Sequence, residues 1–125
     1  MSQENVEVVR AIYDAWTKQV SAAHLIAADI EYDNPPYAVE SGTRHDRKAL
    51  ASVREVYPDF RIEPERYIDA GENVVVIGLA TGTGASGARF ERRQAYLWTI
   101  RDGKAIRFRW FNDPAEALAA VGLSE

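Results

Sequence analysis

The spacing of apolar residues divides the chain into a helical first part and a sheet-forming second part. Near the N-terminus apolar residues recur at steps of three and four, which predicts an amphipathic helix. An apolar run over 22–28 predicts a second helix, and 31–36 a brief strand closed by prolines. Helical spacing returns from Ala49 to Tyr57 and stops at Pro58, which predicts a third helix.

From Phe60 onward the helical period gives way to alternation of apolar and polar residues, which is typical of strands. Turn sequences at 70–73 and 101–104 separate the alternating runs, so we expect a four-stranded antiparallel meander. The segment 113–116 has an acid, a proline and a glutamate in the order that starts a helix, and Gly122 stops it.

Alternation on the last two predicted strands collects large aromatic residues on one face, where Ile106 is expected beside Phe108. Aromatic walls with a few polar groups are what a small-molecule pocket needs, although the same aromatics could simply fill the core. The pattern favours a ligand-binding face. Its expected residues are Trp16, Tyr32, Asn34, Tyr57, Arg92, Gln94, Tyr96, Trp98, Trp110 and Asn112.

The opposite face of the predicted sheet also carries apolar residues. The strand 74–83 is apolar at both alternating positions, and Leu97 and Phe111 point to the same outer side. No predicted helix remains to cover this face, so we expect a homodimer that forms sheet to sheet. The last strands also carry arginines that form either a solvated, ion-paired rim or an anion site: Arg89, Arg93, Arg101, Arg107 and Arg109.

Composition and charge limit the kinds of partner that we expect for this chain. The chain has 125 residues, 46% hydrophobic and 27% charged, which suits one globular domain over 1–125. A net charge of -4 disfavours nucleic acid and membrane partners, and no apolar run is long enough for a membrane span. The absence of cysteine suits a cytoplasmic protein. His24 and His45 are isolated from each other and have no carboxylate at metal-ligand spacing, so we expect no metal. We also expect no cofactor.

Four stretches in this order resemble the SnoaL-like branch of the nuclear transport factor 2-like superfamily, over essentially the whole chain. The resemblance implies an α+β fold, the cystatin-like roll, in which a cone-shaped, curved, mixed or antiparallel sheet wraps around N-terminal helices. It also implies a cavity, frequent dimerisation, and either small-molecule enzymes or plain binding domains. The stretches are 5–16, 68–75, 97–104 and 113–118.

The activities known for this superfamily can be compared with the matching positions. Ketosteroid isomerases of this fold use an aspartate base where this chain has Asn34, and their oxyanion-holding pair matches Ile12 and Tyr96. Limonene-epoxide-hydrolase-like members share the spacing of Tyr32 and Asn34, but this chain lacks their acid and base, with Trp110 at the last acidic position. The usual carboxylate base is therefore missing.

The sequence thus predicts a protein that binds a small, largely apolar molecule. Whether it is an enzyme is left open. A reaction would be of the lyase, isomerase or cyclase type, with Arg92 or Tyr96 stabilising negative charge. The alternative is a non-catalytic dimerisation or regulatory module.

Overall fold

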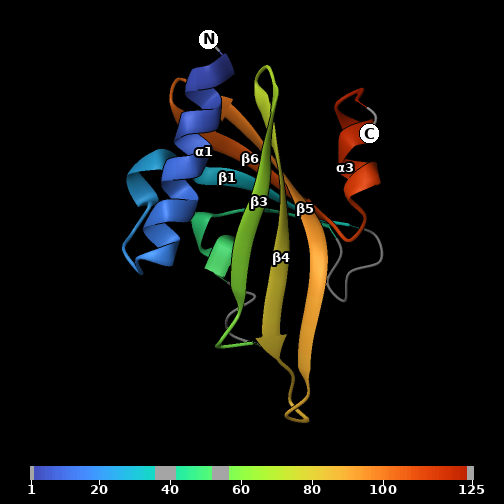
Figure 1. Ribbon diagram of the computed structural model, residues 1–125. Coiled ribbons are helices and arrows are strands. Elements are labelled where there is room, and N and C mark those ends of the chain that lie inside the picture. The colour runs from blue at the N-terminus through green and yellow to red at the C-terminus, as the bar shows by residue number, and fades with distance from the viewer. Residues whose placement is uncertain (1, 36–41, 52–56, 124–125) are drawn as a thin grey trace.

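The computed structural model describes residues 2–35, 42–51 and 57–123, whose helices and strands are built around one curved sheet (Figure 1). The α-helices are α1 (Ser2–Thr17) and α3 (Pro114–Ala120), and the short 3-10 helices are η1 (Ala23–Leu25) and η2 (Arg47–Ala51). The strands are β1 (Ile26–Asn34), β2 (Gly42–His45), β3 (Arg61–Ala70), β4 (Asn73–Thr83), β5 (Arg89–Arg101) and β6 (Lys104–Phe111).

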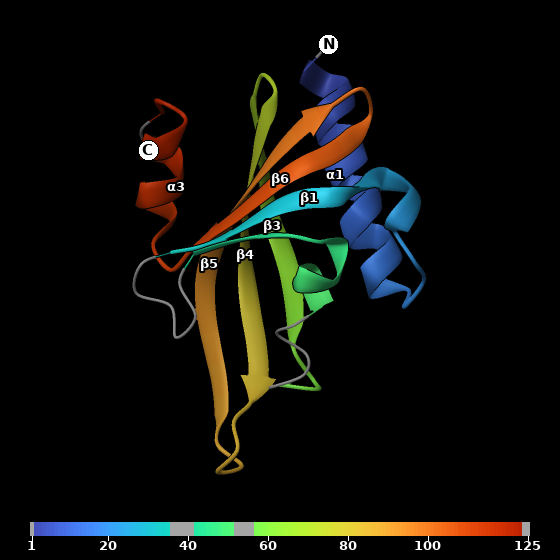
Figure 2. The same ribbon diagram turned by 180° about the vertical axis from the view of Figure 1, so that it is seen from behind.

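The strands lie in the order β2-β1-β6-β5-β4-β3. Neighbours are antiparallel except β1 and β6, which run parallel, so the sheet is mixed. Figure 2 shows β1, β2 and β6 crossing β3 and β4 at a steep angle. The long, bent β5 lies between β6 and β4 and so belongs to both parts of the sheet. The sheet therefore curves into an unclosed cone, which confirms the predicted α+β fold and the β3–β6 meander.

The main core lies on the concave face, where α1 packs against the sheet. Val9 and Ile12 of α1 are fully buried in the same cluster as Val76 and Trp98. The helical spacing predicted at the N-terminus is confirmed because these residues lie on one side of α1. Val20 continues the same apolar spacing in the sequence and was expected in the helix, but it follows the end of α1 and is 56% exposed.

The convex face carries a second core, and here the sequence prediction was wrong. A helix does cover this face: Ala117 and Leu118 of α3 are buried against Val75 and Leu97. The seven-residue helix is short, but it brings its apolar side back onto β4 and β5. The sheet-to-sheet homodimer was predicted because no expected helix remained to cover the convex face, and α3 removes that reason. The homodimer stays a prediction.

The prediction of a helix over 22–28 is wrong except for one short turn. Only Ala23–Leu25 form a 3-10 helix, and β1 begins at Ile26, which pairs with Ala105 of β6. Alanine favours a helix locally, but β1 pairs with β6 at Ile26 and again from Glu31 after a register shift, and the strand buries Ile26 and Ile30.

Two other boundaries differ from prediction. The first strand, expected over 31–36, is longer and ends at Asn34; position 36 lies outside the described residues. The third helix was expected from Ala49 to Tyr57, but the described part is a 3-10 helix over Arg47–Ala51. The stretch 52–56 lies outside the described residues, so that part of the prediction is untested.

The predicted turns and caps are confirmed. Asp102 and Gly103 both have positive φ in the two-residue turn between β5 and β6, as a type I′ hairpin requires. Asp113 accepts a hydrogen bond from the Ala115 amide and starts α3, and Gly122 with φ of 76° ends it.

The β5–β6 pairing also contains a register shift that the sequence did not reveal. Thr99 pairs with Arg107, but the next pair is Ile100 with Ala105, so Ile106 is left without a partner in the ladder. Ala105, rather than Ile106, joins the main core. The assignment of Ile106 to the face of Phe108 was therefore wrong by one residue.

Candidate functional site

Strand register brings aromatic residues from three strands into rows on the concave face. Tyr32 of β1 pairs with Phe108 of β6, and Phe108 pairs with Trp98 of β5. Trp110 pairs with Tyr96 in the same way. Directly paired residues point to the same side of a sheet, so these five side chains form one surface, which we call the aromatic floor.

The rings of the aromatic floor are closely packed. Phe108 lies between Tyr32, with ring centres 5.3 Å apart, and Tyr96, at 6.1 Å, and both pairs are stacked. Trp98 is fully buried and donates a 3.0 Å hydrogen bond from Nε1 to the hydroxyl of Tyr13 on α1. The helix therefore closes the Trp98 end of the floor. Tyr32, Tyr96 and Phe108 are buried in the same core cluster, and Trp110 packs against it half-buried.

A chain of polar side chains continues from the other end of the floor along β5 and past the end of β6. The Tyr96 hydroxyl donates to Gln94 Oε1 at 2.7 Å, and Gln94 Nε2 donates to Asn112 Oδ1 at 2.8 Å. Arg92 Nη1 reaches the same Asn112 oxygen at 3.5 Å, the long limit of a hydrogen bond. We call Tyr96, Gln94 and Asn112 the polar chain.

The two tyrosines of the floor are neutral hydrogen-bonding groups. Burial raises the pKa of Tyr96 well above its ordinary value, and the nearby Tyr32 raises it further. Burial also raises the pKa of Tyr32, although the charge of Arg44 and a hydrogen bond with Trp110 act in the opposite direction. Trp110 Nε1 also donates to Asn34 Oδ1 at 2.8 Å. Both phenols therefore keep their protons at neutral pH.

Three of the predicted ligand-binding residues lie away from the floor or at its edge. Trp16 of α1 lies beside Trp98, with ring centres 5.8 Å apart. Tyr57 packs edge-on against Phe90, near the start of β5, at 5.0 Å. Arg92 is exposed, whereas the other predicted residues are buried or half-buried. The structure gathers the remaining predicted residues on one surface, and ligand binding by them stays a prediction.

Sequence reasoning missed two residues of this surface. Tyr13 was counted only as part of the apolar stripe, although a buried phenol needs a polar partner, and its hydroxyl accepts from Trp98. Arg44 of β2 pairs with Tyr32 and so shares the concave side of the sheet. No sequence signal marked Arg44, because β2 is four exposed residues without apolar alternation.

The acidic and histidine groups of the described residues do not form a metal site or join the floor. No group of three or more histidine, aspartate or glutamate residues in the described parts of the chain could hold a metal ion. His24 is exposed, and so is His45, whose Nε2 lies 3.6 Å from Glu31. None of the helices formed by described residues is long and apolar enough to cross a bilayer.

Asp33 of β1 is held by hydrogen bonds from the two neighbouring strands, β2 and β6. Its carboxylate accepts from the Thr43 hydroxyl at 2.6 Å and from Arg107 Nε at 2.9 Å. Partial burial raises the pKa of Asp33, but these hydrogen bonds and the charges of Arg107 and Arg109 together outweigh it, so the pKa lies below its usual range. This carboxylate is a structural ion-pair partner rather than a base.

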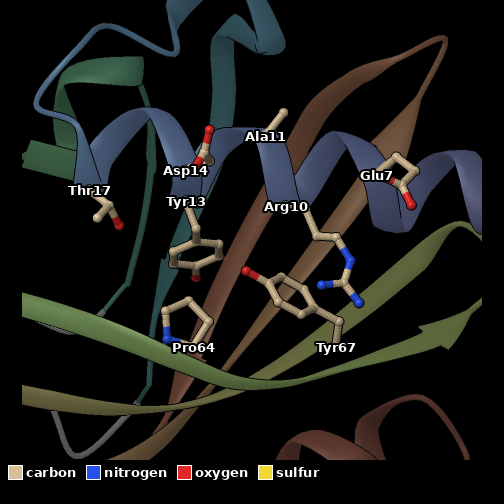
Figure 3. Close-up of a pocket in the computed structure, with 8 residues that line it drawn as sticks. All are labelled: Glu7, Arg10, Ala11, Tyr13, Asp14, Thr17, Pro64 and Tyr67. Carbon is tan, nitrogen blue, oxygen red and sulfur yellow. The ribbon is translucent and has the colours of Figure 1, made fainter.

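A separate groove lies between α1 and β3 (Figure 3). The Arg10 guanidinium lies 4.3 Å from the ring centre of Tyr67, and the Tyr67 hydroxyl points toward Tyr13. Glu7 and Asp14 bring two negative charges to the same groove, against the single positive charge of Arg10. The groove has a volume of about 490 Å³ and is lined by Glu7, Arg10, Ala11, Tyr13, Asp14, Thr17, Pro64 and Tyr67.

Comparison with known proteins identifies the family. The SnoaL-like domain family matches residues 9–108, and the chain belongs to this family, within the nuclear transport factor 2-like superfamily. A nuclear transport factor 2-like protein from Burkholderia xenovorans is 30% identical, with 97% of each chain covered and a TM-score of 0.67. No functionally curated protein matches the chain.

Two further solved structures are similar over nearly the whole chain. A nuclear transport factor 2-like protein of unknown function from Burkholderia pseudomallei is 26% identical, covering 95% of this chain and 98% of its own, with a TM-score of 0.73. TerC, solved after co-crystallisation with polyporic acid, is 25% identical, covering 94% of this chain and 98% of its own, with a TM-score of 0.74.

Proposed function

We propose that this protein binds a small, largely apolar molecule on the aromatic floor, oriented by the polar chain. The observation that carries the proposal is the run of hydrogen bonds from Tyr96 through Gln94 to Asn112, which continues an aromatic surface on the concave face. Apolar walls provide desolvation, and a few polar groups in fixed positions provide orientation.

The similarity to TerC supports the proposal from a second direction. TerC shares the fold over nearly the whole chain, and it was co-crystallised with polyporic acid, a small molecule. A cone of this kind can therefore be matched to a small-molecule partner in a relative of comparable size. We propose the same class of partner here, and not the same compound.

The groups on the floor favour binding over acid–base catalysis. Asn34 cannot serve as a base, and Tyr32 and Tyr96 keep their protons because burial raises the pKa of each. What the Tyr32 phenol can supply is hydrogen-bond donation to an oxygen that gains negative charge, as in a lyase, isomerase or cyclase step, because the Tyr96 hydroxyl already donates to Gln94.

The second candidate is a non-catalytic dimerisation or regulatory module. It is favoured by the burial of Trp98 at 0% exposure and Tyr96 at 2%, which is what a solid core also gives. Native mass spectrometry of the purified protein separates the two, because it reports subunit number and a retained small molecule together. A dimer with no retained molecule would favour the module.

The direct test is a fluorescence titration with N-phenylnaphthylamine, a neutral aromatic probe that brightens in apolar surroundings. The wild-type protein should give a saturable rise. Trp110→Ala should weaken binding about tenfold by removing one wall of the floor. Phe111→Ala is the matched control, since the neighbouring side chain packs on the convex face with α3.

The comparison between the two variants decides the outcome. Both variants lose aromatic packing, so both should be less stable, but only Trp110→Ala should lose affinity. Equal losses of affinity in Trp110→Ala and Phe111→Ala, or no saturable binding by the wild type, would count against the proposed site.

A further inference from the structure

We propose that the ligand carries an acidic group that is ionised at neutral pH, and that one of the two arginines Arg44 and Arg92 holds it. This inference rests on the proposed function, because it names the chemical class of the molecule bound at the aromatic floor. The two arginines lie at the two ends of one arc of polar groups. The arc runs through Arg44, Tyr32, Tyr96, Gln94, Asn112 and Arg92.

Arg44 marks one end of the arc. It pairs with Tyr32 across β1 and β2 and therefore lies on the concave side of the sheet. Its charge is close enough to favour the ionised form of the Tyr32 hydroxyl. Its ion pair with Asp46 is loose, at 4.0 Å, with both side chains nearly half exposed, so the pair holds Arg44 only weakly.

Arg92 marks the other end. It pairs with Ala80, a small residue of the concave face. Its hydrogen bond to the Asn112 oxygen is long, at 3.5 Å. Within the described parts of the chain, Arg92 makes no ion pair with a carboxylate. A guanidinium has five donors, and one long hydrogen bond to a neutral amide leaves most of them for a ligand.

Three arginines of the sheet differ from Arg92 in this respect, whereas Arg61, Arg89 and Arg109 also make no ion pair within the described parts of the chain. Arg93 lies 2.8 Å from Glu65, Arg107 lies 2.8 Å from Glu31, and Arg101 lies 3.6 Å from Glu72. The chain as a whole is acidic, with a net charge of -4, so carboxylates are plentiful elsewhere. The arc itself contains two arginines and no carboxylate, which favours an anion and disfavours a cation.

The neutral members of the arc fit the same ligand class. The phenol of Tyr32 can donate a hydrogen bond, whereas that of Tyr96 already donates to Gln94, and hydrogen bonds to an ionised oxygen are about twice as strong as those between neutral groups. An aromatic or polycyclic molecule with one acidic group would place its ring on the floor and its charge toward an arginine. A carboxylate, an acidic enol and a sulfonate share this chemistry.

Two probes with one aromatic skeleton test the inference: N-phenylnaphthylamine, which is neutral, and anilinonaphthalene sulfonate, which adds an anionic group. The wild-type protein should bind the sulfonate more tightly than the neutral probe. Whichever arginine holds the sulfonate, its replacement in Arg44→Gln or Arg92→Gln should weaken binding of the sulfonate about fivefold, the size of one partly exposed charge contact. Binding of the neutral probe should stay within about twofold.

Arg101→Gln is the matched control, since it removes the same charge from the β5–β6 turn, where Arg101 lies beside Glu72. It should leave the affinity for both probes unchanged. Added salt should weaken binding of the sulfonate and leave the neutral probe unaffected, because screening acts on the charge alone.

The outcomes separate this inference from the function on which it rests. Saturable binding of the neutral probe with no preference for the sulfonate would overturn the acidic-ligand inference and leave the proposed function standing. Failure of both probes to bind would overturn both. A loss of sulfonate affinity in Arg101→Gln equal to that in the more affected of Arg44→Gln and Arg92→Gln would also overturn the inference, because net charge rather than the arc would then explain the binding.

Discussion

Replacing Tyr13 with phenylalanine removes one hydroxyl from the place where α1 meets the aromatic floor. Trp98 is fully buried, and its Nε1 donates to the Tyr13 hydroxyl at 3.0 Å. The variant keeps the ring and its edge-on contact with Trp98, at 5.9 Å, so packing changes little. The indole N–H, however, loses its acceptor in an environment without water.

The expected cost follows from that unpaired donor. Leaving a buried donor unsatisfied costs roughly 1–3 kcal/mol. For a domain of this size such a loss lowers the thermal midpoint by roughly 3–10 °C. Urea unfolding followed by circular dichroism measures the free energy directly, and the slope against urea should be unchanged because the exposed surface does not change.

Tyr67→Phe is the matched control for Tyr13→Phe. The Tyr67 ring also contacts Tyr13, at 6.3 Å, but it is half-buried and its hydroxyl has no hydrogen bond to another described residue. Its removal should change stability by less than about 0.5 kcal/mol. Equal losses in the two variants, or no loss in Tyr13→Phe, would refute the reasoning about the buried indole.

Two further perturbations test the ion pair at the strand edge and the cover of the convex face. Asp33 has a lowered pKa, so its stabilising contribution is complete above the unfolded value of about 4 and is lost as pH falls through the folded pKa. Asp33→Asn should cost about 1 kcal/mol at neutral pH and flatten the loss of stability in acid, measured by urea unfolding across a pH series; parallel pH profiles would contradict this. Leu118→Ala should cost roughly 2–4 kcal/mol by calorimetry because the side chain is 3% exposed, whereas Leu123→Ala, at 40% exposure, should cost little; equal effects would mean that α3 does not cover β4 and β5.

Features fixed by neighbouring residues could be predicted from the sequence. The stripe of α1, the Asp102–Gly103 turn and the Asp113 cap each depend on residues close together in the chain, and all are confirmed. The same holds for the concave-facing positions of β5, because strict alternation assigns each side chain to a face. These local rules were enough to predict the fold class and most residues of the candidate site.

Features fixed by distant contacts could not be predicted. Residues 26–28 belong to a strand because β1 pairs with β6, far along the chain. The cover provided by α3 depends on where the helix returns, which no local pattern states. Arg44 reaches the site from a four-residue edge strand whose position is set only by its pairing with β1. Tertiary pairing therefore decided each of these assignments.

The most direct test of the central claim is the crystal structure of the protein with N-phenylnaphthylamine bound. We predict that the naphthalene ring lies against Tyr32, Tyr96 and Trp110 on the concave face. A probe found instead in the groove between Arg10 and Tyr67, or on the convex face beside α3, would contradict the assignment of the aromatic floor as the binding site.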